Sequence, residues 1–460
     1  MFISLLVSIV NDFDTGFFPL LMSTFLTFMM GVFPFVFVTE VDAITKKESY
    51  VVVAGSWILS CVIGFFPYIL WGGEFTLVDA IFESVSGYTT TGSTILNDIE
   101  ALPKSLIFWR SSTHLLGGAG VVVFAMALVP MLSKARASLS NVELSPFVKD
   151  NFKYKMQKAI HVLIGVYALL IICEALLLKI AGMTWFDAIN HAFSTVATGG
   201  FSTKNLSIAY FDSIWIEVII MFFMILSSVH FGLLYATFTG KRPNLFSSEV
   251  VRYYIISMFL AIGIITLNLW STQEYAFFES LRYGSFQFLS VVTTTGFATI
   301  DSALWPPLSV ALIILFSFQC GCAGSTAGGI KADRVLVLLK TFRAEFRKIQ
   351  HPDAIIRLRL SGQNVSNDLV HSTLIFAFLF VAATLVGTFF AALMGVDIIT
   401  ALTGSVASIS NIGPGFGGVS SMSNYDGLPD SVKIVFSILM LVGRLELYGF
   451  LQLFFIDSWK

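Results

Sequence analysis

The chain has 460 residues, of which 56% are hydrophobic and 12% are charged, and its formal net charge is −2. Soluble globular proteins average about 25% charged residues, so this composition excludes a protein that stays in water. Apolar runs long enough to span a bilayer, about 17–25 residues, recur from end to end. The sequence therefore predicts an all-α polytopic membrane protein.

Eight apolar runs are the clearest candidates for membrane helices. In chain order they are Phe17–Val38, Val51–Trp71, Phe108–Leu132, Ala159–Gly182, Ile214–Thr239, Tyr253–Trp270, Leu369–Gly395 and Ile434–Ile456. The first of them is predicted to be an extra N-terminal helix that stands before a repeated unit.

Basic residues gather in four of the loops between these runs. The clusters cover residues 46–47, 134–158, 241–252 and 340–359. By the positive-inside rule these loops face the cytoplasm. They adjoin membrane segments and do not alternate with exposed aromatic residues, which disfavours nucleic-acid binding. Solvated faces and anchors to the lipid bilayer explain the loops as well as a docking surface does.

A short polar segment recurs between the basic loops. The four copies are "SGYTTTGSTI", "STVATGGFST", "SVVTTTGFAT" and "SISNIGPGFG", and they align on Gly92, Gly199, Gly296 and Gly413. The intervals between these glycines are 107, 97 and 117 residues. Repetition at such a period indicates one supersecondary unit used several times.

Each unit reads as a helix, a short re-entrant helix, an extended loop and a second helix. Irregular backbone at membrane depth is tolerated only where it is buried or lines a wet cavity. We therefore expect four membrane–pore-loop–membrane repeats around one central pore. The predicted divisions are 1–48 for the N-terminal helix region, then 49–135, 136–245, 246–350 and 351–460 for the four repeats.

The polar segments are predicted to form an ion selectivity filter. Carbonyl rings can replace the hydration shell of a cation, and the short helices aim their negative dipole ends at it. One TTTG string is a common turn, but four at near-regular spacing favour the filter. The predicted ligands are Thr90, Thr91, Gly92, Thr198, Gly199, Thr294, Thr295, Gly296, Asn411, Ile412 and Gly413.

An acid precedes three of the glycines by 12 to 16 residues, namely Asp79, Asp187 and Asp397. A carboxylate there caps the short helix and complements its positive end. In the third repeat Arg282 stands near that place, and whether Glu279 compensates is left open by the sequence.

The motifs "ESVSGYTTTGST", "FDAINHAFSTVATGGFST", "SVVTTTGF", "CAGSTAGGIK", "SNIGPGFG" and "GRLELY" resemble the Trk/Ktr/HKT superfamily of potassium transporters, closest to its bacterial TrkH branch. The resemblance covers nearly all of the chain after about residue 17. It implies a multi-pass inner-membrane homodimer with one potassium-selective pore per subunit. Met1–Val10 looks like the tail of a further helix that this branch carries.

The segment Phe318–Arg334, "FQCGCAGSTAGGIKADR", interrupts an apolar helix with small residues. A phosphate-loop interpretation fails, because Lys331 is not followed by Ser or Thr and no nucleotide fold surrounds it. A packing kink is one explanation. The resemblance implies an intramembrane gate, with Gly321, Gly324, Ser325, Gly328, Gly329 and Lys331 as its residues and Arg444 as a pore barrier to cations.

Arg444 lies deep in the last apolar run, where a charge is costly and indicates function. The alternative for it is a buried pair with Glu446, although residues i and i+2 point to different helix faces. The resemblance further implies docking of a cytoplasmic TrkA-type subunit, to which any nucleotide ligand would belong. Transport coupled to sodium, as in a Ktr-type symporter, remains an alternative.

An enzyme is not expected. The six histidines lack metal-ligand spacing, and the sequence has neither HExxH nor the Gly-x-Ser-x-Gly elbow of a hydrolase. His114, His191 and His230 are predicted to form hydrogen bonds between helices. The four cysteines lie in apolar stretches and behave as small hydrophobes. No bound cofactor is expected, and an intramembrane hydrolase is the competing functional class.

Overall fold

The structure is a computed structural model that describes residues 1–38, 46–137, 146–240, 244–272, 275–354 and 356–447. Its helices are α1 (Phe2–Val10), α2 (Phe17–Phe37), α3 (Lys46–Trp71), α4 (Leu77–Tyr88), α5 (Lys104–Ala137), α6 (Pro146–Ile180), α7 (Trp185–Val196), α8 (Ile214–Ser228), α9 (Phe231–Phe238), α10 (Glu249–Thr272), α11 (Phe277–Val292), α12 (Pro307–Phe316), α13 (Ala332–Gln350), α14 (Asn367–Leu393), α15 (Ile398–Ser410) and α16 (Asp430–Arg444). The short strands are β1 (Gln319–Cys320), β2 (Ile330–Lys331), β3 (Arg359–Leu360) and β4 (Gln363–Asn364). Short 3-10 turns cover Ser207–Phe211, Leu245–Ser247, Ser302–Leu304 and Gly417–Val419.

The predicted repetition is present: in each repeat a long helix is followed by a short, mostly buried helix, an irregular segment and a further helix. Repeat 1 is α3–α5, repeat 2 is α6–α9, repeat 3 is α10–α13 and repeat 4 is α14–α16, and the short helices are α4, α7, α11 and α15. Within the described ranges, five helices are long and apolar enough to cross a membrane, and the bent pair α8–α9 adds a sixth if it counts as one span. The expected fold class is confirmed.

Two helices precede the first repeat. The predicted N-terminal helix is α2, and only 11% of its spanning window is buried in the protein, as suits a helix that faces lipid. The shorter α1 packs on α5. Asp14, in the turn between the two helices, accepts hydrogen bonds from the backbone amide and the hydroxyl of Ser105, at 3.0 and 2.7 Å. These bonds attach the N-terminal pair to repeat 1.

The run Ile214–Thr239 forms two helices with a sharp bend between them and not one straight helix. Its two halves, α8 and α9, are bent by 105°. Residues of repeat 3 bind the backbone groups that the break leaves without helical partners. The Phe231 amide donates to the Gly324 carbonyl at 3.1 Å, and the Ser228 carbonyl accepts from the Cys322 amide at 2.8 Å. An inserted segment of this kind is a recognised cause of a sharp helix break.

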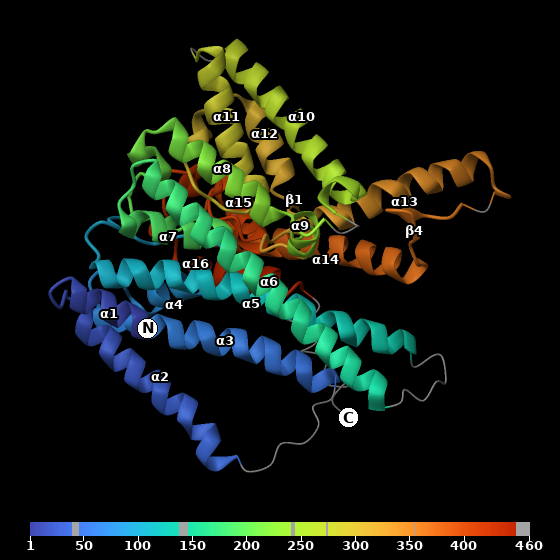
Figure 1. The fold of residues 1–460 in the computed structure, drawn as a ribbon. Helices are drawn as coiled ribbons and strands as arrows, with labels where there is room; N and C mark the ends of the chain where they lie inside the picture. Colours follow the sequence, from blue (N-terminus) through green and yellow to red (C-terminus); the bar gives the residue numbers. More distant parts are fainter. Residues whose placement is uncertain (39–45, 138–145, 241–243, 273–274, 355, 448–460) are drawn as a thin grey trace.

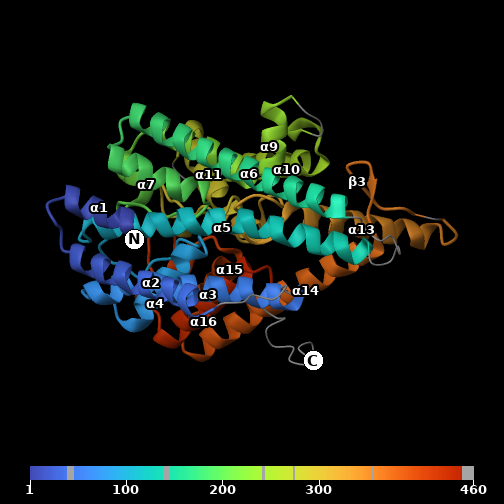
Figure 2. The ribbon, with the colours of Figure 1, turned by 60° about the horizontal axis from the view of Figure 1, so that its bottom comes forward.

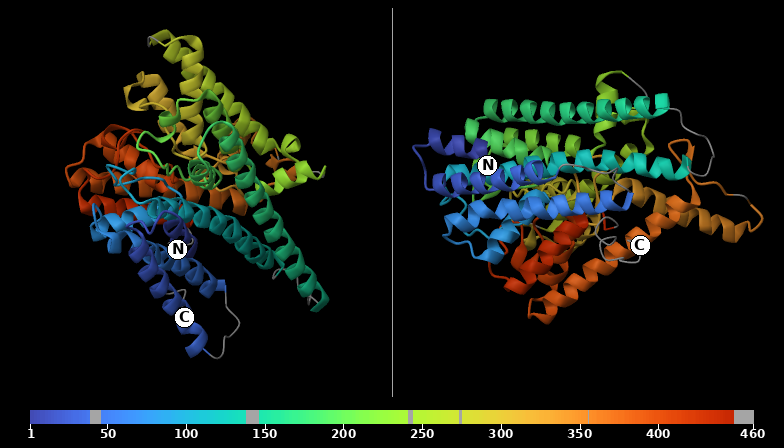
Figure 3. Two further views of the ribbon diagram at one scale, coloured as in Figure 1. Left: turned by 60° about the vertical axis from the view of Figure 1, so that its left-hand side comes forward. Right: turned by 90° about the horizontal axis from the view of Figure 1, so that it is seen from below.

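The long helices α3, α5 and α6 run in roughly the same direction (Figure 1). Helices α3, α5 and α6 run side by side in two further views (Figures 2 and 3). At one end, α13 and the β3–β4 hairpin extend beyond the neighbouring helices (Figure 1). That projecting part carries the predicted basic cluster from Lys340 to Arg359.

The four short helices are buried along most of their length. Three have a side-chain cap: Thr76 and Thr184 cap α4 and α7 by accepting from the amides of Asp79 and Asp187, and Asp397 caps α15. The N-cap residue of α11 is Ala276, which has no capping side chain. Such caps satisfy amides that the first helical turn leaves free. The chain can therefore start and stop these helices inside the protein.

Candidate ion pathway

All four short helices end in the same turn. One residue with positive φ follows each helix: Thr90 (φ 52°), Thr198 (55°), Thr294 (59°) and Asn411 (55°). The next amide reaches back five residues, from Thr91 to the Ser86 carbonyl, Gly199 to Ser194, Thr295 to Ser290 and Ile412 to Ala407, at 2.8–2.9 Å. This is the Schellman arrangement for a helix end. The chain then turns away from the helix axis at an equivalent place in every repeat.

The structure corrects the alignment of the glycines in repeat 2. Two residues after the left-handed turn residue stands a glycine with positive φ: Gly92 (82°), Gly200 (82°), Gly296 (81°) and Gly413 (98°). The sequence alignment used Gly199 and is one residue out of register. Gly199 instead occupies the place of Thr91, Thr295 and Ile412, and a β-carbon on it would lie 2.4 Å from the His114 ring.

These glycines join the four turns into one closed ring. A β-carbon on Gly92 would lie 2.0 Å from the Gly199 carbonyl oxygen, and one on Gly200 would lie 2.1 Å from that of Thr295. The same contact joins Gly296 to the Ile412 oxygen at 2.2 Å and Gly413 to the Thr91 oxygen at 2.6 Å. The contacts pass from repeat 1 through repeats 2, 3 and 4 and back to repeat 1. Only glycine fits at these places.

The ring presents main-chain oxygens that lack partners. Within the described part of the chain, no hydrogen bond reaches the carbonyls of Thr91, Gly92, Gly199, Gly200, Thr295, Gly296 or Ile412. Buried backbone carbonyls in proteins are almost always paired. Most threonine hydroxyls nearby are paired, Thr89 with Thr91 at 2.8 Å and Thr293 with Thr295 at 2.9 Å, whereas the buried Thr90 hydroxyl has no partner among the described residues. The unpaired oxygens at the ring are thus mainly main-chain carbonyls.

The fourth quarter of the ring differs from the others. The Gly413 carbonyl accepts hydrogen bonds from the Tyr425 hydroxyl at 2.7 Å and the Ser93 hydroxyl at 3.2 Å. Asn411 donates to the Thr91 hydroxyl and to the Met440 carbonyl, each at 3.0 Å. Repeat 4 is therefore fastened to repeat 1 through side chains.

The acids at the helix starts lie where they were expected. Asp79 and Asp187 are the third residues of α4 and α7. In repeat 3 Glu279 takes the same place and accepts from the Ala276 amide at 3.0 Å, so it does replace the missing acid. Arg282 turns away and pairs with Glu217 at 2.7 Å. Hydrogen bonds from Thr400 lower the pKa of Asp397 below its ordinary value.

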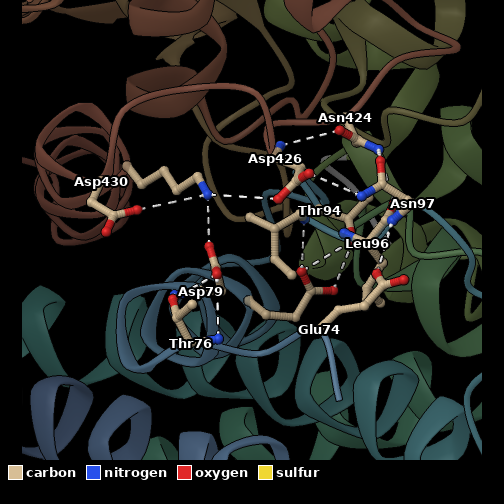
Figure 4. Close-up of polar contacts among 12 residues, drawn as sticks. Glu74, Thr76, Asp79, Thr94, Leu96, Asn97, Asn424, Asp426 and Asp430 are labelled. Carbon is tan, nitrogen blue, oxygen red and sulfur yellow. Dashed lines mark hydrogen bonds and ion pairs between the residues drawn. The ribbon is translucent and has the colours of Figure 1, made fainter. Parts of the chain in front are cut away.

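A pocket of about 120 Å³ opens above the ring, and all four glycines Gly92, Gly200, Gly296 and Gly413 line it. Its wall joins repeats 1 and 4, where Asn97 donates to Asp426 at 2.9 Å and Asn424 donates to Asn97 at 2.8 Å (Figure 4). Beside them, the Lys433 ammonium lies 2.7 Å from Asp79. Hydrogen bonding from Asn205, with further bonds from nearby amides, lowers the pKa of exposed Asp98 at the rim. The ring thus has a polar mouth.

The predicted gate segment packs against the opposite side of the ring. The Gly328 amide donates to the Thr294 hydroxyl at 3.0 Å, and a β-carbon on Gly328 would lie 2.2 Å from the Ser410 carbonyl. The Thr326 hydroxyl donates to the Val196 carbonyl at 3.0 Å. The segment therefore touches the ends of three short helices at once. It is not a kinked helix, because β1 and β2 pair in parallel across it.

The other predicted gate residues shape this segment. Gly324 and Gly329 have positive φ, of 78° and 63°. The Ser325 hydroxyl donates to the Cys322 carbonyl at 2.7 Å, and the buried Lys331 ammonium donates to the Ala327 carbonyl. A β-carbon on Gly321 would lie 2.7 Å from that of Ala327. These contacts lie within the segment, and they add to the bonds that Cys322, Gly324 and Thr326 make with neighbouring elements.

Arg444 binds the segment Phe318–Arg334, which is the predicted gate. Its guanidinium is buried and donates to the carbonyls of Thr326 at 2.9 Å and Gly117 at 3.2 Å. The alternative pair with Glu446 does not form, because Glu446 binds Arg334 instead. Arg444 thus links the gate segment to α5 of repeat 1.

Of the three histidines predicted to bond between helices, His114 does so, to Ser194 at 3.0 Å. His191 bonds the Asp187 carbonyl of its own helix and the Ser202 hydroxyl, while the ring of His230 accepts from the Gly232 amide. No cluster of three metal-ligating side chains occurs among the described residues. The basic residues from Lys134 to Lys158 all lie outside the part of the chain whose side chains are described.

Sequence reasoning missed Gly200, Thr326 and Tyr425. The glycine pair in "ATGGF" was the signal for Gly200, since either glycine fits the alignment. Thr326 stands inside the predicted segment, but nothing in its surroundings distinguishes it from Ser325. Tyr425 carries no local signal, because its contact with Gly413 depends on the fold.

Comparison with known proteins agrees with this architecture. Residues 20–458 match the family model TrkH, described as a cation transport protein. The chain is 35% identical over 423 residues to the Trk system potassium uptake protein TrkG of Escherichia coli, covering 90% of this chain and 86% of that protein. It is 33% identical over 417 residues to TrkH of Halomonas elongata, with the same coverage.

A solved structure extends the likeness to three dimensions. The crystal structure of the potassium transporter TrkH from Vibrio parahaemolyticus superposes with a TM-score of 0.90 at 28% identity, covering 100% of this chain and 96% of that one. Sequence and fold thus agree along the whole chain, which is a multi-pass membrane transport protein rather than an enzyme. The chain belongs to the TrkH family of cation transport proteins.

Proposed function

We propose that this chain is the pore-forming subunit of a potassium uptake system and carries K⁺ inward across the bacterial inner membrane. The observation that carries the proposal is the closed ring of buried carbonyls without hydrogen-bond partners. Carbonyl rings of this kind replace the hydration shell of K⁺. The names of the relatives, which are potassium uptake proteins and a potassium transporter, support the choice of ion.

The proposed filter is the ring and the turn residues that precede its glycines. It comprises Thr90–Gly92, Thr198–Gly200, Thr294–Gly296 and Asn411–Gly413, which is the predicted set with Gly200 added. The dipoles of α4, α7, α11 and α15 direct negative potential toward it. The divisions 1–48, 49–135, 136–245, 246–350 and 351–460 remain our proposal for the organisation of the chain.

The segment from Phe318 to Arg334 is the proposed gate. It packs on three short-helix ends, so an ion that leaves the ring meets it first. Arg444 is proposed both to hold the gate, through Thr326, and to repel cations there. Its bond to Gly117 ties the gate to a neighbouring repeat, which gives the closed arrangement a fixed anchor.

Assembly is part of the proposal. We propose a homodimer that docks a TrkA-type nucleotide-binding subunit on its cytoplasmic face. The basic, projecting region from Lys340 to Arg359 supports such a docking surface (Figure 1). The nucleotide would bind to the partner, and this chain would hold only the transported K⁺.

Uptake of K⁺ or Rb⁺ by cells that lack their own potassium transporters tests the function. The chain is expressed with and without a TrkA-type subunit, and with and without an inward sodium gradient. Growth at low potassium and faster Rb⁺ uptake are expected in at least the complete system. Dependence on the sodium gradient would instead favour a Ktr-type symporter. No uptake under any condition, with the protein present in the membrane, would refute the proposal.

A further inference from the structure

Each short helix has an equivalent position, whose side chain in repeats 1 and 2 contacts the strand that leaves the ring. This position lies nine residues before the ring glycine, and it holds Glu83 in repeat 1, His191 in repeat 2, Gln287 in repeat 3 and Gly404 in repeat 4. In a symmetric pore these four positions would do the same work. Here they carry an acid, an imidazole, an amide and no side chain, so the support of the ring is unequal.

Repeat 1 has the strongest support. The fully buried Glu83 carboxylate accepts from the Thr94 hydroxyl at 3.0 Å and from the Ile95 amide at 3.2 Å. Both donors lie just beyond Gly92, and Thr94 is visible in Figure 4. The same carboxylate also forms an ion pair with the buried Arg110, whose Nε lies 2.8 Å from its Oε1. Glu83 thus holds the outgoing strand of the first quarter.

Arg110 extends this support to repeat 2. Its Nη1 donates to the Ser202 carbonyl at 3.4 Å, two residues beyond Gly200. Its guanidinium also lies 4.1 Å from the centre of the Phe201 ring, a cation–π contact, and the His114 ring stacks on the same phenylalanine at 4.1 Å. One arginine therefore contacts the strand that follows the ring glycine in two neighbouring quarters.

Repeats 3 and 4 have no equivalent. Gln287 reaches the Ser421 hydroxyl at 2.8 Å, and the residue that corresponds to Thr94 in repeat 3 is Ala298, which has no polar side chain. Gly404 has no side chain, and a β-carbon there would lie 2.9 Å from the Phe436 ring. Glu83 and Arg110 together form what we call the charged brace. Within the described residues, it is confined to the half of the ring made by repeats 1 and 2.

We propose that Glu83 and Arg110 are positioning residues for ion selectivity. They hold the carbonyls of Gly92 and Gly200 apart, so that these oxygens cannot close around an ion smaller than K⁺. The inference rests on the proposed function of the ring as a potassium filter. Without the brace, the outgoing strands of two quarters relax, and Na⁺ is admitted more readily while K⁺ still passes.

The test measures K⁺ and Na⁺ flux into proteoliposomes that contain purified full-length protein. Glu83→Gln keeps the shape of the side chain but removes its charge and leaves Arg110 buried without an anion. We expect the K⁺/Na⁺ flux ratio to fall about fivefold or more, the factor that corresponds to roughly 1 kcal/mol. Thermal unfolding in detergent is measured on the same samples, because an unpaired buried charge also destabilises a protein.

The double variant Glu83→Gln/Arg110→Met separates positioning from stability. It removes both charges, so the unfolding temperature is expected to recover, whereas the flux ratio is expected to stay low because the brace is absent. Glu217→Gln is the matched control, since it deprives Arg282 of a buried partner away from the outgoing strands. It should lower stability and leave the ratio unchanged.

Two results would overturn the proposal: a flux ratio that recovers with stability in the double variant, or an equal loss of ratio in Glu217→Gln. Both would assign Glu83 and Arg110 a purely structural role. Wild-type protein without K⁺ preference would refute the proposed function itself. A K⁺-selective wild type with an unchanged Glu83→Gln variant would refute only the brace.

Discussion

Alanine at Gly200 tests the register of the ring. Gly200 has a φ of 82°, and its β-carbon would lie 2.1 Å from the Thr295 carbonyl oxygen. Gly199 has no positive φ, and its β-carbon would meet the His114 ring at 2.4 Å. The two substitutions therefore meet different obstacles: at Gly200 a backbone carbonyl of the next repeat, at Gly199 a side chain of α5 that can be removed.

The expected effect at Gly200 has two parts. Alanine in the left-handed region costs about 1–2 kcal/mol. Because carbon and carbonyl oxygen in contact stay about 3.3 Å apart, the Thr295 carbonyl must also move by about 1 Å. If 1–2 kcal/mol of this strain falls on the ion-binding geometry, the preference for K⁺ over Na⁺ falls roughly 5- to 30-fold.

The assay compares K⁺ and Na⁺ flux into proteoliposomes for Gly200→Ala, Gly199→Ala, His114→Ala and the double variants Gly199→Ala/His114→Ala and Gly200→Ala/His114→Ala. Gly200→Ala should lose selectivity with either residue at position 114. Gly199→Ala should also lose it, but the double variant should regain most of it, because the obstructing ring is gone. Selectivity that survives Gly200→Ala, together with a loss in Gly199→Ala that His114→Ala does not repair, would return Gly199 to the ring-glycine position and refute the reasoning.

Three further predictions follow from the same contacts. Arg444→Ala removes the donors to Thr326 and Gly117, so ion flux should rise about tenfold for roughly 1.4 kcal/mol of lost gate stabilisation; unchanged single-channel activity would contradict this. Tyr425→Phe removes one donor to the Gly413 carbonyl, so the K⁺ concentration for half-maximal uptake should fall about fivefold for about 1 kcal/mol, measured as Rb⁺ uptake; a change in stability alone would contradict it. Asp397→Ala removes the cap of α15 and should lower the free energy of unfolding by about 1 kcal/mol near neutral pH. Since the pKa of Asp397 is lowered in the folded protein, its contribution is present above the unfolded pKa of about 3.9 and is lost as the pH falls through the lower folded value, so thermal unfolding of variant and wild type should converge in acid.

Much of this architecture was predictable because its signals are local. A short helix that starts and stops inside a membrane protein needs its own caps. Asp79, Asp187 and Asp397 mark three of the helix starts in the sequence. The ends are marked by small residues that accept a left-handed turn followed by a glycine. These signals require no knowledge of neighbouring repeats, so the sequence predicts the four ring segments and their order.

The errors arise where a neighbour decides the conformation. In "ATGGF" both glycines permit positive φ, and Gly200 takes it because α7 ends so that Thr198 is the left-handed turn residue, two positions earlier. The run from Ile214 to Thr239 has no proline at its break, and the bend is sustained by amides and carbonyls that repeat 3 supplies to Ser228 and Phe231. Pairing of β1 with β2 likewise brings together residues near the two ends of the segment from Phe318 to Arg334.

The unequal quarters of the ring bear on how an ion passes through it. Under the proposed function, an ion at the level of the glycines meets free carbonyls from repeats 1, 2 and 3, whereas the Gly413 carbonyl shares its charge with the hydroxyls of Tyr425 and Ser93. A conducting site must bind its ion strongly enough for entry and weakly enough for release. The hydrogen bonds from these hydroxyls reduce the negative potential that the Gly413 carbonyl offers to an ion, and they do so without widening the ring. Repeat 4 therefore favours release, while the charged brace of repeats 1 and 2 keeps the spacing that selects the ion.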